Sequence, residues 1–467
     1  MNRFKYISRV VPALGFCLFL GTSGCDQELD LSPQQSIDAN EALRTSQGVE
    51  SALIGAYSIL QSGSLYGGDL NLTSELLGGT PSTISWAGSF ATYRQISQRS
   101  ITAENGIVTG TWITAYQAIN AVNNVINAIN VVDEARRERV LGEAHFIRGI
   151  MYFELVRLFG LPYEPGQTNS QLGVPIVLTP TTIITDENKV SRNTVEEVYA
   201  QAIADLTQAK NLLPESNGSR ADTYAASAFL ARVYLQQAGA GNNAAANQFL
   251  TKAAEEADRV ISEGGFSLVP EYENEFNNSQ NTSEDIFAIQ QTVQSNAGSA
   301  NAGLATFYSA NERAEIEISP SFVASFEPGD ERADVYFLSE DDILFNHKYE
   351  DYAANIPVVR LAEMYLIRAE ANQRLGGAPI GGVTPVEDIN TIRERADLDP
   401  VASVTLDDIL RERSFELAFE GQALHDAKRL RRNVANQAYN SPRLVLPIPL
   451  REINANSNLV QNPGYTG

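Results

Sequence analysis

Cysteine, histidine and methionine are scarce in this sequence of 467 residues, which holds 2 cysteines, 3 histidines and 3 methionines. Both cysteines, Cys17 and Cys25, stand at the start of the chain. The rest of the protein therefore has no cysteine for a disulfide, a thiolate metal ligand or a thiol nucleophile. A fold of this size must then be held together by packing rather than by disulfide cross-links.

The histidines and acidic residues form no recognisable catalytic pattern. His145, His347 and His425 are far apart in sequence, and none belongs to a His-Glu-x-x-His zinc motif. The sequence also lacks a P-loop and the Gly-x-Ser-x-Gly turn of many hydrolases. A glycosidase needs two carboxylates beside the scissile bond, but Asp341-Asp342 and Asp407-Asp408 are typical of a solvated turn and a helix start. We therefore expect no enzymatic activity, no metal site and no cofactor.

Basic residues and long apolar runs are also scarce in this sequence. Lysine and arginine number 34 against 57 aspartate and glutamate residues, which leaves a net charge of −23. So acidic a chain disfavours nucleic acid and anionic lipid as partners. The apolar run at residues 10–20 is shorter than the roughly 20 residues that span a bilayer, and no other run reaches that length.

The start of the chain has the layout of a secretory signal. Basic residues precede the apolar run, and the small residues at 22–24 follow it directly before Cys25. This order resembles a bacterial lipoprotein signal, although Thr22 occupies a position that is usually leucine. It predicts that 1–24 is removed as a lipoprotein signal peptide, that Cys25 is acylated, and that 25–40 is an acylated N-terminus and linker. An ordinary secretory signal with a chance cysteine is the alternative.

Apolar residues recur at helical spacing through most of the remaining chain. This periodicity predicts a mostly α-helical protein, with a first helix start near residue 38. The expected helices cover residues 49–60, 107–130, 133–159, 194–213, 221–237, 244–263, 357–375, 385–395 and 405–431.

Three of these helices share a pattern that resembles a degenerate tetratricopeptide repeat. Phe229-Leu-Ala-Arg and Tyr365-Leu-Ile-Arg are each followed by a glycine seven or eight residues after the arginine, and His145-Phe-Ile-Arg is a looser copy. Such units bury their apolar faces by stacking on one another. We expect a helical-repeat scaffold at about 107–263 and 357–432.

Two regions interrupt this helical pattern. The first, about 64–103, is rich in glycine, serine, threonine and aromatic residues, and we expect it to be a long ordered loop. The second, about 265–356, carries short apparent strands at 286–290 and 315–318. The C-terminal tail, 440–467, is predicted to be extended.

Four passages, in order along the chain, carry a family pattern. They are Cys25-Asp-Gln-Glu-Leu-Asp-Leu-Ser-Pro33, Ala52-Leu-Ile-Gly-Ala-Tyr-Ser-Ile-Leu60, Ile409-Leu-Arg-Glu-Arg-Ser-Phe-Glu-Leu-Ala-Phe-Glu-Gly421 with its continuation to Arg429, and residues 446–465. Together they resemble the SusD/RagB family of outer-membrane nutrient-binding lipoproteins. Ala423 and His425 depart from the residues common in the third passage.

The resemblance implies a SusD-like domain at 41–467, with a tetratricopeptide-like scaffold and a loop-rich ligand-binding region. It implies a lipid anchor in an outer membrane of the Bacteroidetes type, with the protein facing the extracellular side. It also implies a partner, a SusC-like TonB-dependent β-barrel transporter. The implied cargo is an oligosaccharide, although some relatives bind peptides. An adaptor of the tetratricopeptide type that carries no nutrient is a further alternative.

Recognition of a sugar requires flat aromatic rings for its apolar face and polar side chains for its hydroxyl groups. The two irregular regions have this composition, and the family resemblance implies a ligand face built from regions of this kind. The alternative for each aromatic residue is a role in anchoring its loop. Trp112, which lies on an apolar helix stripe, is expected in the core. The candidate ligand-binding residues are Tyr66, Asp69, Asn71, Trp86, Phe90, Tyr93, Phe307, Tyr308, Asn311 and Arg313.

Overall fold

A computed structural model describes residues 42–182, 185–298, 301–339 and 342–466. The predicted signal peptide, Cys25, the linker and the predicted helix start near residue 38 all lie outside the described residues. From Leu43 onward the chain forms one compact unit. None of the described helices combines length with apolar character in the way that crossing a membrane requires.

Helices make up most of this unit, which confirms the prediction of a mostly α fold. Several begin at strong polar caps: Thr194, Thr384 and Thr405 each form a reciprocal capping box with the acidic residue three positions later. The longer helices are α2 (Ser46–Leu60), α5 (Gly106–Asn127), α6 (Glu134–Phe159), α7 (Val195–Leu212), α8 (Thr223–Ala238), α9 (Ala244–Glu263), α12 (Leu361–Leu375), α13 (Pro385–Arg395) and α14 (Leu406–Glu416). The shorter ones are α3 (Asp69–Gly78), α4 (Ala91–Ser97), α10 (Leu304–Tyr308), α11 (Pro320–Val323), α15 (Ala423–Arg429) and α16 (Leu450–Ala455).

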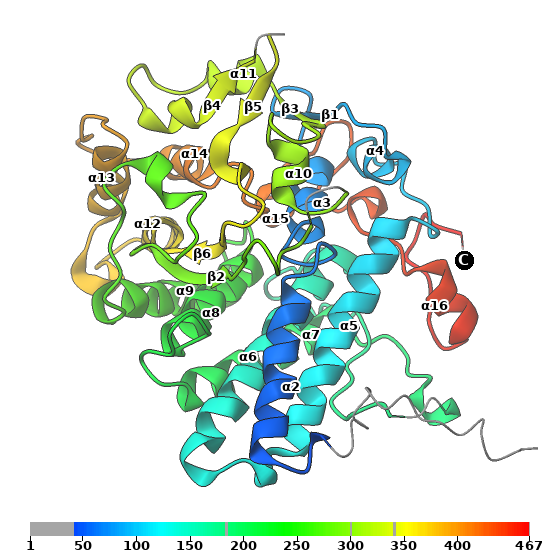
Figure 1. Cartoon of the computed structure of the whole chain (residues 1–467). Coiled ribbons are helices and arrows are strands. Elements are labelled where there is room, and N and C mark those ends of the chain that lie inside the picture. The colour runs from blue at the N-terminus through cyan, green and yellow to red at the C-terminus, as the bar shows by residue number, and fades with distance from the viewer. Residues whose placement is uncertain (1–41, 183–184, 299–300, 340–341, 467) are drawn as a thin grey trace, which may run out of the picture. The chain divides into compact units, whose positions relative to one another are not determined.

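The long helices pack one on the next, as a helical-repeat scaffold requires (Figure 1). α5 packs on α6, α6 on α7, α7 on α8 and α8 on α9. Gly149 of α6 permits a close contact with α7, since a Cβ there would lie 2.9 Å from Leu206 Cγ. Trp112 of α5 is 4% exposed, which confirms its predicted place in the core.

The two halves of the scaffold are separated in sequence but joined in space. α9 packs directly against α12, although residues 265–356 lie between them in the chain. Arg368 of α12 donates at 2.6 Å both to Asp258 of α9 and to Asp388 of α13. The helical stack therefore continues from α9 through α12 to α13 and α14 without a gap for the intervening region.

That intervening region contributes most of two small antiparallel sheets. One has the strand order β1 (Ile84–Trp86), β3 (Ile316–Ile318), β5 (Leu344–Asn346) and β4 (Tyr336–Leu338). The other pairs β2 (Asp285–Ile289) with β6 (Ile356–Arg360). Because β1 comes from the first irregular region and β3 from the second, the first sheet brings both together, with Trp86 opposite Ile316 (Figure 1).

The prediction of a long loop in the first irregular region is wrong, because the region contains two helices. α3 buries most of its residues, including the polar side chains of Thr73, Ser74 and Glu75. A helix that is buried on nearly all sides shows no amphipathic period, and its polar residues resemble those of a loop. The second helix, α4, is only 7 residues long, which is too short for a helical period to be read.

Three further predicted boundaries differ from the structure. Residues 357–360 belong to strand β6 rather than to α12. The helix expected at 405–431 is divided into α14 and α15, because Phe419 and Gly421 have φ values of 62° and 80° and turn the chain. The tail that was expected to be extended contains α16.

Candidate ligand-binding site

Four of the predicted ligand residues form one aromatic cluster: Trp86 at the end of β1, Phe90 before α4, Tyr93 in α4 and Phe307 in α10. Ring centroids lie 4.7 Å apart for Trp86 and Tyr93, 4.9 Å for Tyr93 and Phe307, and 6.1 Å for Phe90 and Phe307. Phe307 and Tyr93 are 0% and 4% exposed, whereas Trp86 and Phe90 are half-buried. Phe307 and Tyr93 therefore support Trp86 and Phe90, which are the two rings that a ligand could reach.

Polar groups surround the half-buried rings. The guanidinium of Arg313 lies 4.7 Å from the centre of the Phe90 ring and pairs with Glu315. Arg313 also donates to Ser89 Oγ at 3.2 Å. Arg94 donates to the carbonyl of Gly88 at 2.8 Å. Together with the exposed Asn311, these side chains offer hydrogen-bonding groups beside a flat apolar surface.

Asp69 lies behind the aromatic cluster rather than on its surface. Tyr93 donates its hydroxyl hydrogen to Asp69 Oδ1 at 2.6 Å, and Asp69 is 5% exposed. Burial raises the pKa of the Asp69 carboxyl to about 7, and the hydrogen bond from Tyr93 opposes part of this rise. Burial, with the nearby Asp69 charge second, raises the pKa of Tyr93 as well. Asp69 thus positions Tyr93 and cannot touch a ligand directly.

Asn71 and Tyr308 hold α3 and α10 against the turn between α14 and α15. Asn71 Nδ2 donates to the carbonyl of Phe419 at 2.9 Å, and the Tyr308 hydroxyl donates to Asn71 Oδ1 at 3.4 Å. Tyr308 is fully buried and its ring lies 5.3 Å from that of Tyr349. Tyr308 therefore belongs to the supporting structure beneath the surface, whereas Asn71 is half-buried and its side chain is engaged in these contacts.

Tyr66 lies apart from the aromatic cluster, beside a small hollow of about 30 Å³. Its hydroxyl donates to Glu154 at 3.0 Å, and Glu154 also accepts two hydrogen bonds from Arg157 at 2.8 and 2.7 Å. Tyr66 is 7% exposed. Its contacts are those of a residue that joins α6 to the start of α3.

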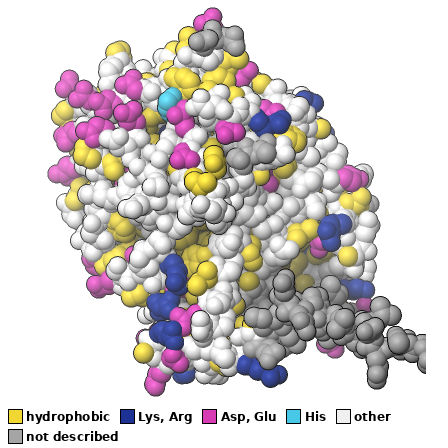
Figure 2. All heavy atoms as spheres, viewed as in Figure 1, with side chains coloured by type: hydrophobic (Ala, Val, Ile, Leu, Met, Phe, Trp, Pro, Cys, Tyr) yellow, Lys and Arg dark blue, Asp and Glu magenta, His cyan; other side chains and the backbone are white. Residues whose placement is uncertain are grey.

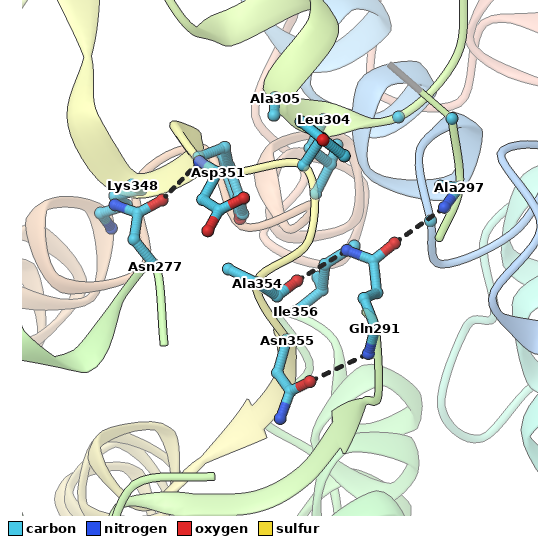
Figure 3. A pocket seen from close by; sticks show the side chains of 15 residues that line it. Asn277, Gln291, Ala297, Leu304, Ala305, Lys348, Asp351, Ala354, Asn355 and Ile356 are labelled. Atoms are coloured by element: carbon cyan, nitrogen blue, oxygen red, sulfur yellow. Dashed lines mark hydrogen bonds between the residues drawn. The ribbon is translucent and has the colours of Figure 1, made fainter. Parts of the chain in front are cut away.

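A neighbouring hollow is lined by amide side chains that the sequence analysis did not single out (Figure 3). Gln291 donates to the carbonyl of Ala354 at 2.7 Å and accepts from the amide of Ala297 at 2.8 Å. Asn355 accepts from the amide of Gln291 at 2.9 Å, and Asn277 accepts from that of Asp351 at 3.2 Å. Because these amides are engaged and the hollow measures about 20 Å³, it can hold a water molecule but not a sugar ring.

Histidine and metal chemistry are not evident at the described positions. His145 lies 2.7 Å from Asp205 between α6 and α7, and His425 is 1% exposed in α15. Both therefore lie in contacts between packed helices. Within the described ranges, no group of three or more histidine, cysteine, aspartate or glutamate residues could hold a metal ion.

Comparisons with known proteins connect this architecture to a family. Residues 29–235 match a family model described as SusD-like, starch-binding associating with outer membrane, and residues 345–443 match the SusD family model. SusD-like protein P2 of Formosa agariphila is 28% identical, over 96% of this chain and 98% of that protein. The starch-binding protein SusD of Bacteroides thetaiotaomicron is 36% identical over a shorter match, 24% of this chain and 22% of that protein.

Solved structures agree with these matches. A SusD superfamily protein from Bacteroides thetaiotaomicron superposes with a TM-score of 0.77 at 26% identity, over 90% of this chain and 100% of that chain. The helical-repeat scaffold with a few short strands is thus shared across the whole of the described unit. The chain belongs to the SusD/RagB family.

Proposed function

We propose that this protein binds an oligosaccharide at the aromatic cluster and delivers it to a SusC-like TonB-dependent transporter in the outer membrane. The observation that carries the proposal is the pair of half-buried rings, Trp86 and Phe90, held on a buried layer of Tyr93 and Phe307 and bordered by Arg313. Starch binding in the family description and in the name of one relative supports a carbohydrate as the cargo.

The arrangement suits a sugar for a physical reason. A pyranose ring has an apolar face of C–H groups and a rim of hydroxyl groups, so it gains both from stacking on an aromatic ring and from adjacent polar side chains. Rings that are already fixed by packing lose little conformational entropy when the ligand binds. Trp86 and Phe90 meet this condition, because each contacts buried aromatic neighbours.

Isothermal titration against a panel of polysaccharides tests the site. Trp86→Ala should weaken binding at least about tenfold, since removing a stacked ring costs roughly 1.4 kcal/mol or more. Tyr439→Ala is the matched control, because Tyr439 is half-buried, contacts Glu164 and takes no part in the aromatic cluster. Equal affinity of folded wild-type and Trp86→Ala protein for every glycan that binds would remove the aromatic cluster from the site.

The anchor and the partner need separate experiments. Metabolic labelling with a clickable fatty acid should mark the mature wild-type protein and leave Cys25→Ala unmarked. A detergent pull-down should recover a β-barrel transporter. Recovery of peptides from the native complex would favour peptide cargo, and recovery of a different protein without a barrel would favour the adaptor.

A further inference from the structure

A larger hollow, of about 210 Å³, lies between α3, α14 and α15. Phe322, Leu417 and Phe419 form its apolar wall, and the small side chains Ala423 and Ala427 on one face of α15 leave it open. None of the ten predicted ligand residues lines this hollow. It is therefore a separate candidate site from the aromatic cluster.

Backbone contacts fix the shape of this hollow. Gly78 at the end of α3 lies so close to α15 that a Cβ there would overlap the backbone of Leu424. Glu75, one turn earlier, accepts a hydrogen bond from the amide of Ala423 at 3.3 Å. Because α3 and α15 meet through backbone atoms, the hollow beside them cannot close by a simple change of side-chain rotamer.

Arg413 supplies an unused hydrogen-bond donor in the lining. Its side chain is deeply buried, and its Nε and Nη2 atoms donate to Asp426 at 2.8 Å and to Glu363 at 3.2 Å. Its Nη1 atom is buried and has no partner in the part of the chain that the structure describes. A buried guanidinium N–H without an acceptor is unfavourable. Since Arg413 lines the hollow, an acceptor that a ligand brought within reach of Nη1 would remove this cost.

A second arginine, Arg432, lines the hollow together with Arg413. Arg432 is exposed and has no acidic side chain within ion-pair distance among the described positions. The carboxylates, in contrast, are already engaged: Asp426 accepts from Arg413 and from Arg429, and Glu75 accepts from the amide of Ala423. The two arginines are therefore the cationic groups that a ligand's carboxylate could meet in this lining.

The size of the hollow limits the ligand to one ring. Its volume of about 210 Å³ exceeds the ~150 Å³ that holds a benzene molecule and lies below the ~300 Å³ at which pockets for larger ligands begin. We propose that this hollow binds a single-ring carboxylate, such as a uronic acid or an aromatic acid. The ring packs on Phe322, Leu417 and Phe419, and the carboxylate faces Arg413 and Arg432.

Saturation-transfer NMR on the purified full chain tests the proposal with four probes: D-glucuronate, benzoate, D-glucose and benzyl alcohol. At least one of the two carboxylates should bind with a dissociation constant of about 1 mM, as expected for a ligand of this size, and the matching uncharged probe should not. Binding of D-glucuronate alone identifies a uronic acid site, and binding of benzoate alone identifies an aromatic acid site.

Two variants locate the binding. Ala427→Leu, which fills the hollow from the half-buried face of α15, should abolish the signal. Arg432→Gln should weaken binding about threefold, the effect of losing one exposed charge. Arg431→Gln is the control, because Arg431 pairs with Glu164 and does not line the hollow. Trp86→Ala should leave this binding unchanged, which separates the result from the oligosaccharide proposal. Failure of both carboxylates to bind at about ten times the expected constant, or binding that survives Ala427→Leu, overturns the proposal.

Discussion

At the scale of single residues, Asp69 links protonation to the aromatic cluster. Its carboxyl group accepts a hydrogen bond from Tyr93, whose ring contacts Trp86. Burial raises the pKa of Asp69 to about 7, above the ~3.9 of an exposed aspartate. The stability that Asp69 contributes is therefore full below the unfolded pKa and is lost as the pH rises through about 7.

Ionisation of Asp69 should be visible in the fluorescence of Trp86. Trp86 and Trp112 are the 2 tryptophans of the sequence, so Trp112→Phe leaves Trp86 as the sole reporter. In that background the emission of Trp86 should change with a midpoint near pH 7, because the Asp69 charge develops behind the neighbouring Tyr93 ring. Asp69→Asn should abolish the transition. A transition that persists in Asp69→Asn would assign it to another group.

The limits of sequence reasoning are clear for individual site residues. Composition singled out Trp86, Phe90, Tyr93, Phe307 and Arg313, which meet in the structure. It could not separate reachable rings from supporting ones, because an aromatic residue among polar neighbours can point either way. The contacts among β1, α4 and α10 in the folded chain decide which side of each ring is covered.

At the scale of secondary-structure elements, alanine substitutions of two helical glycines should change the stability of the protein in opposite directions. Gly149→Ala should destabilise the protein by about 1 kcal/mol or more, because overpacking at Leu206 outweighs the better helix propensity of alanine. Gly55→Ala in α2 should stabilise it by about 0.5–1 kcal/mol, since a Cβ there meets nothing within 4 Å. Chemical denaturation measures both. Stabilisation by Gly149→Ala would contradict the close packing of α6 on α7.

Elements with a clear apolar period were predictable, and elements without one were not. α7, α9 and α13 lie within a residue or two of their expected bounds, because each has one buried face and a polar cap. The sequence of α3 shows no apolar period, because this helix is buried on nearly all sides. The break between α14 and α15 depends on a positive φ at Phe419, which no propensity favours in a phenylalanine.

At the scale of the whole molecule, the contact between α9 and α12 could not be read from the sequence. Each helix alone fits a repeat, but the intervening region gives no sign that the two repeats stack on each other. Arg368, shared between Asp258 and Asp388, marks the junction in the structure. Arg368 is the signal that could have suggested this contact. It is a buried arginine, and the repeat that holds it has no other repeat directly before it in the sequence.

The distribution of charge is a second feature that belongs to the whole molecule. The net charge is −23, and acidic side chains gather on one part of the surface near α13 (Figure 2). There, partial desolvation and then the charges of neighbouring carboxylates, Asp397 and Asp334 first among them, raise the pKa of Glu331. Repulsion among these groups grows as the pH rises, so it disfavours the folded state most at alkaline pH.

Buried carboxyl groups also make the folded state less stable as the pH rises. Burial raises the pKa of both Asp69 and Glu75 to about 7. Between about pH 4 and 7 the folded state therefore holds protons at these two groups that the unfolded state has released. Glu416 and Glu420 behave in the opposite way, because the charges of the arginines and lysine around them lower the pKa of each despite burial. Their contribution is present above the ~4.3 of an exposed glutamate and is lost as the pH falls through their lowered pKa values.

The protein should consequently be more stable at about pH 5.5 than at pH 7.5. The expected gain is on the order of 1 kcal/mol for each of Asp69 and Glu75, and a melting temperature several degrees higher at the lower pH would show it. The double variant Asp69→Asn, Glu75→Gln should reduce the slope of the profile over this interval, because neither replacement titrates. Trp86→Ala should retain the full slope. A double variant with the same slope as the wild-type protein would show that these two carboxyl groups are ionised in the folded state.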